Sequence, residues 1–148
     1  MHPTAARLAE RLRGRGLQIE VRTLNDSART APLAAAALGV QVGQIVKSLL
    51  FLHDDEPVMV LCAGDRRVDA KRLGLRPAPA DQVRAATVFS IGGVPPLGHD
   101  VPLPTTIDES LRRFEVVWAA AGTPHEVFAI ETDSLIRALP DAEVTAVS

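Results

Sequence analysis

The segment Gln44-Ile45-Val46-Lys47-Ser48-Leu49-Leu50-Phe51-Leu52 decides the fold, because its aliphatic and β-branched residues are typical of a buried strand. A polar turn follows at residues 53–57, and residues 58–63 form a second apolar run of strand length. Two such runs joined by a short turn predict an antiparallel hairpin. A hairpin argues against a purely parallel, doubly wound sheet, so the expected fold class is mixed α/β (α+β).

Helices and strands alternate on both sides of this hairpin. Helical spacing of apolar residues and terminal proline or glycine signals predict helices over residues 3–13, 30–38, 69–73, 80–86 and 132–139, with a short helix after Asp108. Asp108 and Thr132 are predicted to cap their helices. Apolar runs of strand length predict strands over residues 17–21, 88–91, 105–107, 116–119, 127–130 and 144–147.

The composition fits a single globular domain over residues 1–148. A hydrophobic content of 47% excludes a disordered chain, and no apolar run reaches the roughly 20 residues of a membrane span. The N-terminal residues lack the apolar region of a signal peptide, and the single cysteine, Cys62, cannot form an intrachain disulfide. We therefore expect a cytoplasmic protein without a membrane partner. The net charge of −2 gives no overall attraction to nucleic acid.

Lys47 is the first candidate functional residue. Alternate residues of a strand share one face, so Lys47 is expected to project beside Ile45, Leu49 and Phe51, where an unpaired ammonium would cost several kcal/mol. Of the 16 basic residues only Lys47 and Lys71 are lysine, and a compact, movable ammonium differs chemically from a guanidinium. The alternative is a lysine on an edge strand whose stem snorkels to solvent.

The loop at residues 92–98 is the second candidate. Gly92 and Gly93 allow the backbone to approach a ligand, while Pro95 and Pro96 stiffen the chain. Backbone N–H groups fixed in this way stabilise a carbonyl or an oxyanion without reorganisation. The alternative is an ordinary turn, since glycine and proline are common in turns.

Four spaced motifs together resemble the YbaK-type aminoacyl-tRNA deacylases, relatives of the editing insertion of bacterial prolyl-tRNA synthetase. The motifs are Val46-Lys47-Ser48-Leu49, Ala63-Gly64-Asp65-Arg66-Arg67-Val68-Asp69, Gly92-Gly93-Val94-Pro95-Pro96 and Ile107-Asp108-Glu109-Ser110-Leu111. The resemblance covers nearly the whole chain in order. It implies a mixed, largely antiparallel, curled sheet with helices packed outside, and hydrolysis that needs neither a metal nor another cofactor.

The resemblance also implies a set of site residues. Lys47 would lie in the pocket, and the loop of Gly92, Gly93, Val94, Pro95 and Pro96 would hold the aminoacyl ester by its backbone. Asp108 matches an acidic position near the pocket, although a purely capping role is the alternative. Residues 121–125 match a segment that lines the amino-acid pocket, which implicates Gly122, Thr123 and His125.

The remaining reactive side chains give weaker signals. Ser48 is not expected to form a dyad with Lys47, because neighbours in a strand point to opposite faces. Cys62 is interpreted as a small core residue. No metal site is predicted, since His2, His53, His99 and His125 lack ligand spacing. His99 is interpreted as a solvated loop residue, with substrate contact as the alternative.

Contact with tRNA would depend on local basic patches. One candidate patch contains Arg66, Arg67, Lys71 and Arg72, with Arg76 close by, and the other is the helical face of Arg7, Arg11 and Arg15. Either patch could instead be a solvated surface. With four phenylalanines, one tryptophan and no tyrosine, the chain has no evident array for stacking single-stranded RNA.

These observations predict a freestanding trans-editing deacylase that hydrolyses the ester of a mischarged small amino acid on tRNA, with tRNA(Pro) as the expected tRNA. Its expected partners are the acceptor end of an aminoacyl-tRNA and an aminoacyl-tRNA synthetase. The first alternative is a non-catalytic module that senses an amino acid or a charged tRNA. The second is a hydrolase of small esters that is indifferent to the tRNA. The edited amino acid and the oligomeric state stay open.

Overall fold

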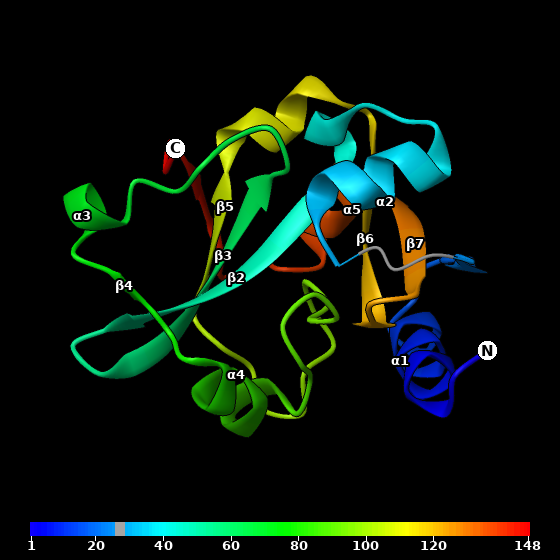
Figure 1. The fold of residues 1–148 in the computed structure, drawn as a ribbon, viewed down its shortest axis with the longest axis horizontal. Coiled ribbons are helices and arrows are strands. Elements are labelled where there is room, and N and C mark those ends of the chain that lie inside the picture. The colour runs from blue at the N-terminus through cyan, green and yellow to red at the C-terminus, as the bar shows by residue number, and fades with distance from the viewer. Residues whose placement is uncertain (26–28) are drawn as a thin grey trace.

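The computed structural model describes residues 1–25 and 29–148, which form two sheets with helices around them (Figure 1). The helices are α1 (Pro3–Gly14), α2 (Ala31–Leu38), α3 (Ala70–Leu73), α4 (Ala80–Thr87) and α5 (Thr132–Arg137), with 3-10 helices η1 (Val42–Gln44) and η2 (Glu109–Arg113). The strands are β1 (Val21–Thr23), β2 (Val46–His53), β3 (Glu56–Ala63), β4 (Arg76–Pro77), β5 (Thr105–Asp108), β6 (Val116–Thr123), β7 (Glu126–Glu131) and β8 (Glu143–Thr145). No helix within the described ranges is long and apolar enough to cross a membrane.

The predicted hairpin is confirmed. β2 and β3 pair antiparallel from Val46 opposite Ala63 to His53 opposite Glu56. The two turn residues, Asp54 and Asp55, have φ angles of 49° and 67°. Aspartate tolerates this left-handed region, which the twist of a two-residue hairpin requires.

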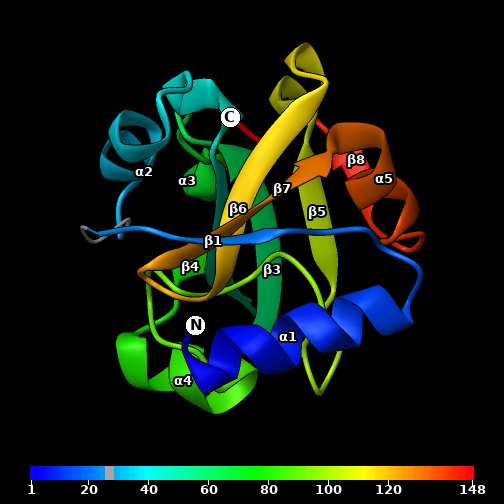
Figure 2. The same ribbon diagram turned by 90° about the vertical axis from the view of Figure 1, so that its right-hand side faces the viewer.

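The sheet order is mixed and largely antiparallel, as expected. The larger sheet has the order β4-β2-β3-β5-β8, in which β5 pairs parallel to both β3 and β8. The smaller sheet has the order β1-β7-β6 and is antiparallel. An isolated parallel bridge between Ile45 and Trp118 joins the two sheets just before β2 begins. Figure 2 shows β1 crossing β6 and β7 in front of the larger sheet.

The helix predictions are confirmed where local signals are strong. α1 buries Ala5, Leu8, Ala9 and Leu12, the apolar face that its periodicity predicts. α2 begins after Thr30, whose hydroxyl accepts a hydrogen bond from the Leu33 amide, and ends at Gly39 with a φ of 69°. α3 likewise ends at a left-handed glycine, Gly74. These ends follow the usual preferences for helix caps.

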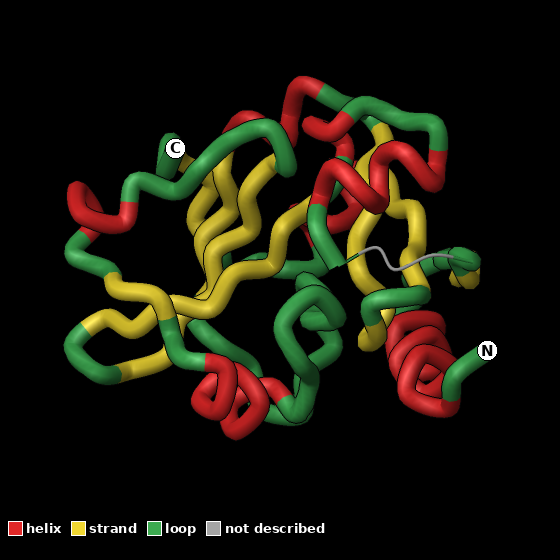
Figure 3. Tube along the Cα trace, viewed as in Figure 1, coloured by secondary structure: helices red, strands yellow, loops and turns green. Residues whose placement is uncertain are grey.

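The strand predicted at residues 88–91 is wrong. Val88 is the C-cap of α4 with a φ of 62°, and the chain then turns rather than extending. The buried Thr87 hydroxyl accepts a hydrogen bond from the Phe89 amide at 3.1 Å. The β-branched and aromatic residues therefore suggested a strand where the helix end and this local hydrogen bond impose a loop, drawn green after α4 in Figure 3.

Both predicted side-chain caps are also wrong. Asp108 occupies the N-cap position of η2, but its carboxylate makes no capping hydrogen bond. Thr132 lies inside α5 rather than before it, and its hydroxyl donates to the Phe114 carbonyl at 2.6 Å. Both side chains bind partners distant in sequence, which the local pattern does not reveal. The strand predicted over residues 17–21 begins only at Val21.

The loop after α4 is packed inside the molecule, because residues 93–99 are all buried. A Cβ on Gly93 would lie 3.0 Å from the Thr123 Cα and 3.1 Å from the Gly122 carbonyl oxygen. A Cβ on Gly98 would lie 2.8 Å from a methyl carbon of Leu8 in α1. The loop is thus enclosed between the β6–β7 hairpin and α1.

Side chains satisfy the carbonyl groups of this buried loop. His99 Nε2 donates to the Pro95 carbonyl at 2.9 Å, and Arg11 donates to the Gly98 carbonyl at 2.6 Å. His99 is only 8% exposed, so its interpretation as a solvated residue is wrong. Burial lowers the pKa of His99, and the hydrogen bond to Pro95 opposes this effect only partly. Its Nδ1 is buried without a hydrogen-bond partner among the described residues.

We predict that Gly93→Ala destabilises the protein by about 1–3 kcal/mol, the typical cost of overpacking, because its Cβ would meet backbone rather than a movable side chain. Urea denaturation gives the free energies of unfolding. Gly14→Ala is the matched control, since nothing lies within 4 Å of the added methyl group and alanine favours a helix. Equal stabilities of the two variants would show that the close approach at Gly93 is not a constraint.

His99 is predicted to make stability depend on pH. Its pKa is lowered on folding, so below the ordinary histidine pKa of about 6.5 the unfolded chain binds the proton more readily than the folded protein does. The free energy of unfolding therefore decreases as the pH is lowered. For one proton, the free energy of unfolding changes by at most about 1.4 kcal/mol per pH unit. His99→Gln keeps an N–H donor and does not titrate, so it should show a shallower decrease between pH 7 and pH 5. The other histidines, His2, His53 and His125, are exposed and are the same in both proteins. Parallel curves of the free energy of unfolding against pH would therefore contradict this prediction.

Candidate functional site

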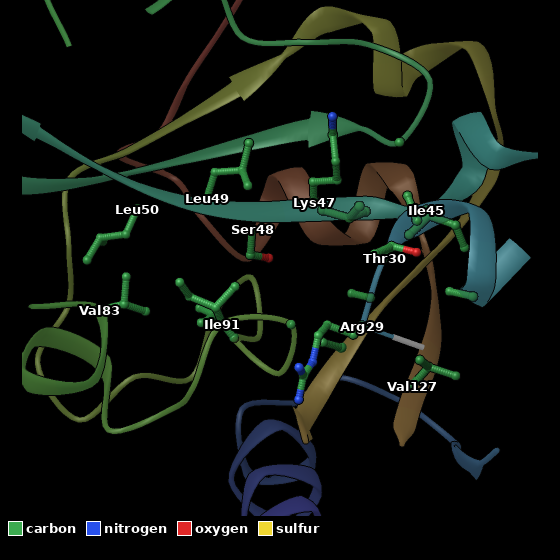
Figure 4. Close-up of a pocket in the computed structure, with 18 of the residues that line it drawn as sticks. Arg29, Thr30, Ile45, Lys47, Ser48, Leu49, Leu50, Val83, Ile91 and Val127 are labelled. Atoms are coloured by element: carbon green, nitrogen blue, oxygen red, sulfur yellow. The ribbon is translucent and has the colours of Figure 1, made fainter. Parts of the chain in front are cut away.

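A cavity of about 590 Å³ lies between β2, the loop after α4 and the β6–β7 hairpin (Figure 4). Most of its lining side chains are apolar. The lining residues include Arg29, Thr30, Ala31, Ile45, Lys47, Ser48, Leu50, Val83, Ile91, Gly92, Val94, Trp118, Thr123 and Val127. Segments far apart in the sequence therefore build one pocket.

The two faces of β2 carry different groups. In Figure 4, Ser48 and Leu50 point toward Ile91 and Val83, while Lys47 and Leu49 point to the opposite side. The prediction that Lys47 and Ser48 do not form a dyad is therefore confirmed. The Ser48 hydroxyl is buried and has no hydrogen-bond partner among the residues that the structure describes. It is a polar atom in a mostly apolar wall.

Lys47 is half-buried, and its ammonium donates a hydrogen bond to the Arg66 carbonyl. The strand register places it opposite Cys62. Although Lys47 belongs to the cavity lining, its ammonium points away from Ile91 and from the loop at residues 92–98, called the glycine loop below. In this conformation the candidate cation and the candidate amides lie on different sides of β2.

Cys62 is fully buried, in agreement with its interpretation as a core residue. Burial raises the pKa of its thiol to about 11, and the nearby Lys47 ammonium opposes this shift only in part. The thiol therefore stays protonated at neutral pH and is a poor nucleophile.

The loop amides differ in availability. The Gly93 amide donates to the Ser90 carbonyl at 2.9 Å and closes a turn. Gly92 lines the cavity with a φ of 90°, and its amide makes no hydrogen bond within residues 1–25 and 29–148. Of the two predicted donors, only Gly92 could offer its amide to a ligand without opening the turn. Val94 lines the cavity, whereas Pro95 and Pro96 are buried behind it.

The segment at residues 121–125 meets the cavity only in part. Thr123 lines it and donates through its hydroxyl to Glu126 at 3.2 Å. Gly122 is buried with a φ of 103°, and its backbone contacts the loop at Gly93. His125 is exposed in the hairpin turn and is not part of the lining.

Asp108 lies outside the cavity lining and is 1% exposed. Its carboxylate accepts hydrogen bonds from the Ser110 hydroxyl, from the Val147 amide at 2.9 Å and from the Ser148 hydroxyl at 3.0 Å. Burial raises the pKa of Asp108, but these hydrogen bonds outweigh it and the net pKa is lowered. In this structure Asp108 joins the C-terminal residues to the end of β5.

The basic patch of Arg66, Arg67, Lys71 and Arg72 is exposed. Arg72 pairs with Asp69 at 3.4 Å, whereas Arg66, Arg67 and Lys71 have no ion pair in the described part of the chain. Their acidic neighbour Asp65 is bound instead by Arg113, at 2.6 Å and 3.0 Å. In the other candidate patch, Arg11 is already paired with Asp100 at 2.7 Å.

Sequence reasoning missed several lining residues. It assigned no role to Arg29, Ile91 or Trp118, and it discussed Ser48 only as a partner of Lys47. Strand alternation placed Ser48 on the face opposite Lys47, but it did not show that this face lines the cavity. No local signal distinguishes Trp118 from an ordinary strand residue, because its place depends on the contact between the two sheets.

The comparisons with known proteins agree with this arrangement. Residues 25–138 match the model of the aminoacyl-tRNA editing domain family. The uncharacterized protein YwhH of Bacillus subtilis (strain 168) is 30% identical over 125 residues, which cover 78% of each chain. A proline–tRNA ligase of Lactobacillus gasseri is 34% identical over 100 residues, which cover 62% of this chain and 18% of the ligase.

Solved structures match the fold over nearly the full length. One, named as a proposed trans-editing enzyme for prolyl tRNA synthetase, has a TM-score of 0.90 and 42% identity, covering 100% of this chain and 98% of the other. Another, hypothetical protein APE2540, has a TM-score of 0.86 and 28% identity, covering 95% of this chain and 97% of the other. Because the family model spans most of the chain, the protein belongs to the aminoacyl-tRNA editing domain family.

Proposed function

We propose that this protein is a trans-editing deacylase, which hydrolyses the ester between a small amino acid and the tRNA that carries it. One observation carries the proposal: β2, the glycine loop and the β6–β7 hairpin, which hold most of the predicted site residues, line a single cavity. Its volume of about 590 Å³ is within the range of small-molecule sites. The proline–tRNA ligase relatives favour tRNA(Pro) as the substrate.

An aminoacyl ester is already activated, so its hydrolysis needs a held carbonyl, a stabilised oxyanion and an oriented water. The Gly92 amide is the proposed donor to the carbonyl. The Ser48 hydroxyl, a buried group without a partner among the described residues, is available to bind the attacking water or the amino-acid group. The mostly apolar wall suits a small side chain.

Lys47 is the proposed cation, and its position sets a condition on that role. Its ammonium must exchange the Arg66 carbonyl for the substrate. A lysine stem has four rotatable bonds, but it leaves β2 on the side opposite Ile91, so the exchange also requires the ester to reach the Lys47 side of the strand. The competing role is structural: Lys47 would hold the Arg66 loop, and with it the basic patch, in place.

We predict that Lys47→Ala lowers kcat by about a hundredfold or more, because it removes the charge that stabilises the oxyanion. Lys47→Arg should also be impaired, because a planar guanidinium does not replace a compact ammonium. Single-turnover hydrolysis of charged tRNA and of a minimal aminoacyl-adenosine measures the effect. His53→Ala, an exposed substitution at the end of β2, is the control. An increase of KM for tRNA alone, with normal hydrolysis of aminoacyl-adenosine, would leave Lys47 only its structural role.

The tRNA is proposed to bind the basic patch of Arg66, Arg67, Lys71 and Arg72. Three of these side chains have no ion pair in the described residues, and Lys47 connects their loop to the strand that lines the cavity. Neutralising phosphates releases condensed counterions, so binding through this patch should weaken steeply with salt.

We predict that Arg66→Glu or Arg67→Glu raises KM for charged tRNA and lowers the slope of log affinity against log salt by about one. Hydrolysis of aminoacyl-adenosine should hardly change, since these residues are not proposed to touch the ester. Arg137→Glu on α5 is the control for net charge. Equal losses with both substrates would show that the patch does not bind the tRNA.

A non-catalytic sensing module is the second candidate function. It is favoured by the hydrogen bonds that occupy the Lys47 ammonium and the Gly93 amide, since neither group is aimed at the cavity in this conformation. The two functions differ in turnover. A panel of tRNAs charged with Ala, Ser, Thr, Cys or Pro decides between them: hydrolysis of any member supports the deacylase, and binding without hydrolysis supports the sensor.

A further inference from the structure

We propose that Trp118 and Arg22 form a subsite for the adenine nucleotide that carries the amino acid. The inference deepens the proposed function, because every aminoacyl-tRNA ester is attached to the ribose of a terminal adenosine. A cavity that receives the amino acid must therefore have the adenine base nearby. Aromatic faces are the usual platforms for unpaired bases, and they accept any base.

Trp118 is the aromatic residue best placed to receive a base. The chain has one tryptophan, four phenylalanines and no tyrosine. Phe51 also lines the cavity but is 8% exposed, and Phe89 and Phe128 are buried in the core. Phe114 is half-buried but lies outside the cavity lining. Trp118 is half-buried and lines the cavity.

The strand pattern of β6 explains this placement. Val117 and Ala119 are buried in the main core, so Trp118 lies on the other face of β6. The bridge between Trp118 and Ile45 fixes it at the start of β2. At ~3.3 Å per residue, Ser48 is about 10 Å further along that strand. The indole therefore lies beside the Ile45 end of the lining, which continues along β2 past Ser48 to Phe51.

Arg22 supplies a charge at the same place. Its guanidinium carbon lies 5.0 Å from the centroid of the Trp118 ring. The Arg22 side chain is exposed and makes no hydrogen bond or ion pair within the described ranges. Trp118 also packs against the apolar cluster of Ala31, Ala34 and Ile45, while the exposed Arg22 lies over its ring. A base would stack there in place of Arg22, whose guanidinium would then bind the adjoining phosphate.

The lone tryptophan gives a direct test that does not depend on catalysis. Adenosine 5′-monophosphate is titrated into the full chain while Trp118 fluorescence is recorded. We expect saturable quenching, and Arg22→Ala should weaken the affinity for the nucleotide about tenfold while affecting adenosine much less. Arg112→Ala, an exposed arginine of η2 outside the cavity lining, should behave like the wild type. No saturable quenching, or equal effects of the two arginine variants, would overturn the proposal.

Substitutions of the ring provide the second measurement. Trp118→Leu should raise KM about tenfold for both charged tRNA and aminoacyl-adenosine with little change in kcat, and Trp118→Phe should restore most of the affinity. An unchanged KM in a folded Trp118→Leu protein would refute the subsite while leaving the deacylase intact. Nucleotide binding without any hydrolysis would support the subsite and refute the deacylase. If Trp118→Leu does not fold, the Arg22→Ala titration still decides.

Discussion

The close approach of two backbones, at Gly93 and at Gly122–Thr123, is the constraint on which the site depends. A side chain on Gly93 would meet main-chain atoms at 3.0–3.1 Å, so the loop after α4 and the β6–β7 hairpin touch with nothing between them. The hairpin belongs to the smaller sheet, whereas β2, the opposite wall of the cavity, belongs to the larger one. The contact therefore fixes the loop, which forms a further wall of the cavity, against the hairpin. Apolar packing alone would be less specific, because side chains can adjust.

A buried loop must satisfy its own polar groups, which explains why α1 matters to the site. Loops usually lie at the surface, because water then serves their carbonyl groups. Here Arg11 of α1 reaches the Gly98 carbonyl, and His99 reaches the Pro95 carbonyl. The guanidinium of Arg11 also pairs with Asp100. An arginine engaged in this way has less to offer a phosphate, so the α1 face is a weaker candidate for tRNA binding than the patch at Arg66.

Features fixed by nearby residues could be predicted from the sequence, and features fixed by distant contacts could not. The β2–β3 hairpin and the glycine ends of α2 and α3 follow from local patterns. Residues 88–91 have a strand-like composition, but the helix end at Val88 and the buried surroundings of the loop prevail. Alternation along β2 predicted that Lys47 and Ser48 face opposite sides. Which of those sides meets the glycine loop depends on how the two sheets join, and no local pattern encodes that.

The position of Lys47 bears on whether the site can catalyse a reaction at all. A hydrogen bond to a charged group contributes about 1.5–3 kcal/mol, so leaving the Arg66 carbonyl would be costly if nothing replaced it. A substrate carbonyl is chemically the same kind of acceptor and recovers most of that energy. An oxyanion is a stronger acceptor, so the exchange becomes more favourable as negative charge develops. An ammonium that leaves Arg66 for the reacting ester would therefore favour the transition state over the ground state, on the condition that the ester reaches the Lys47 side of β2.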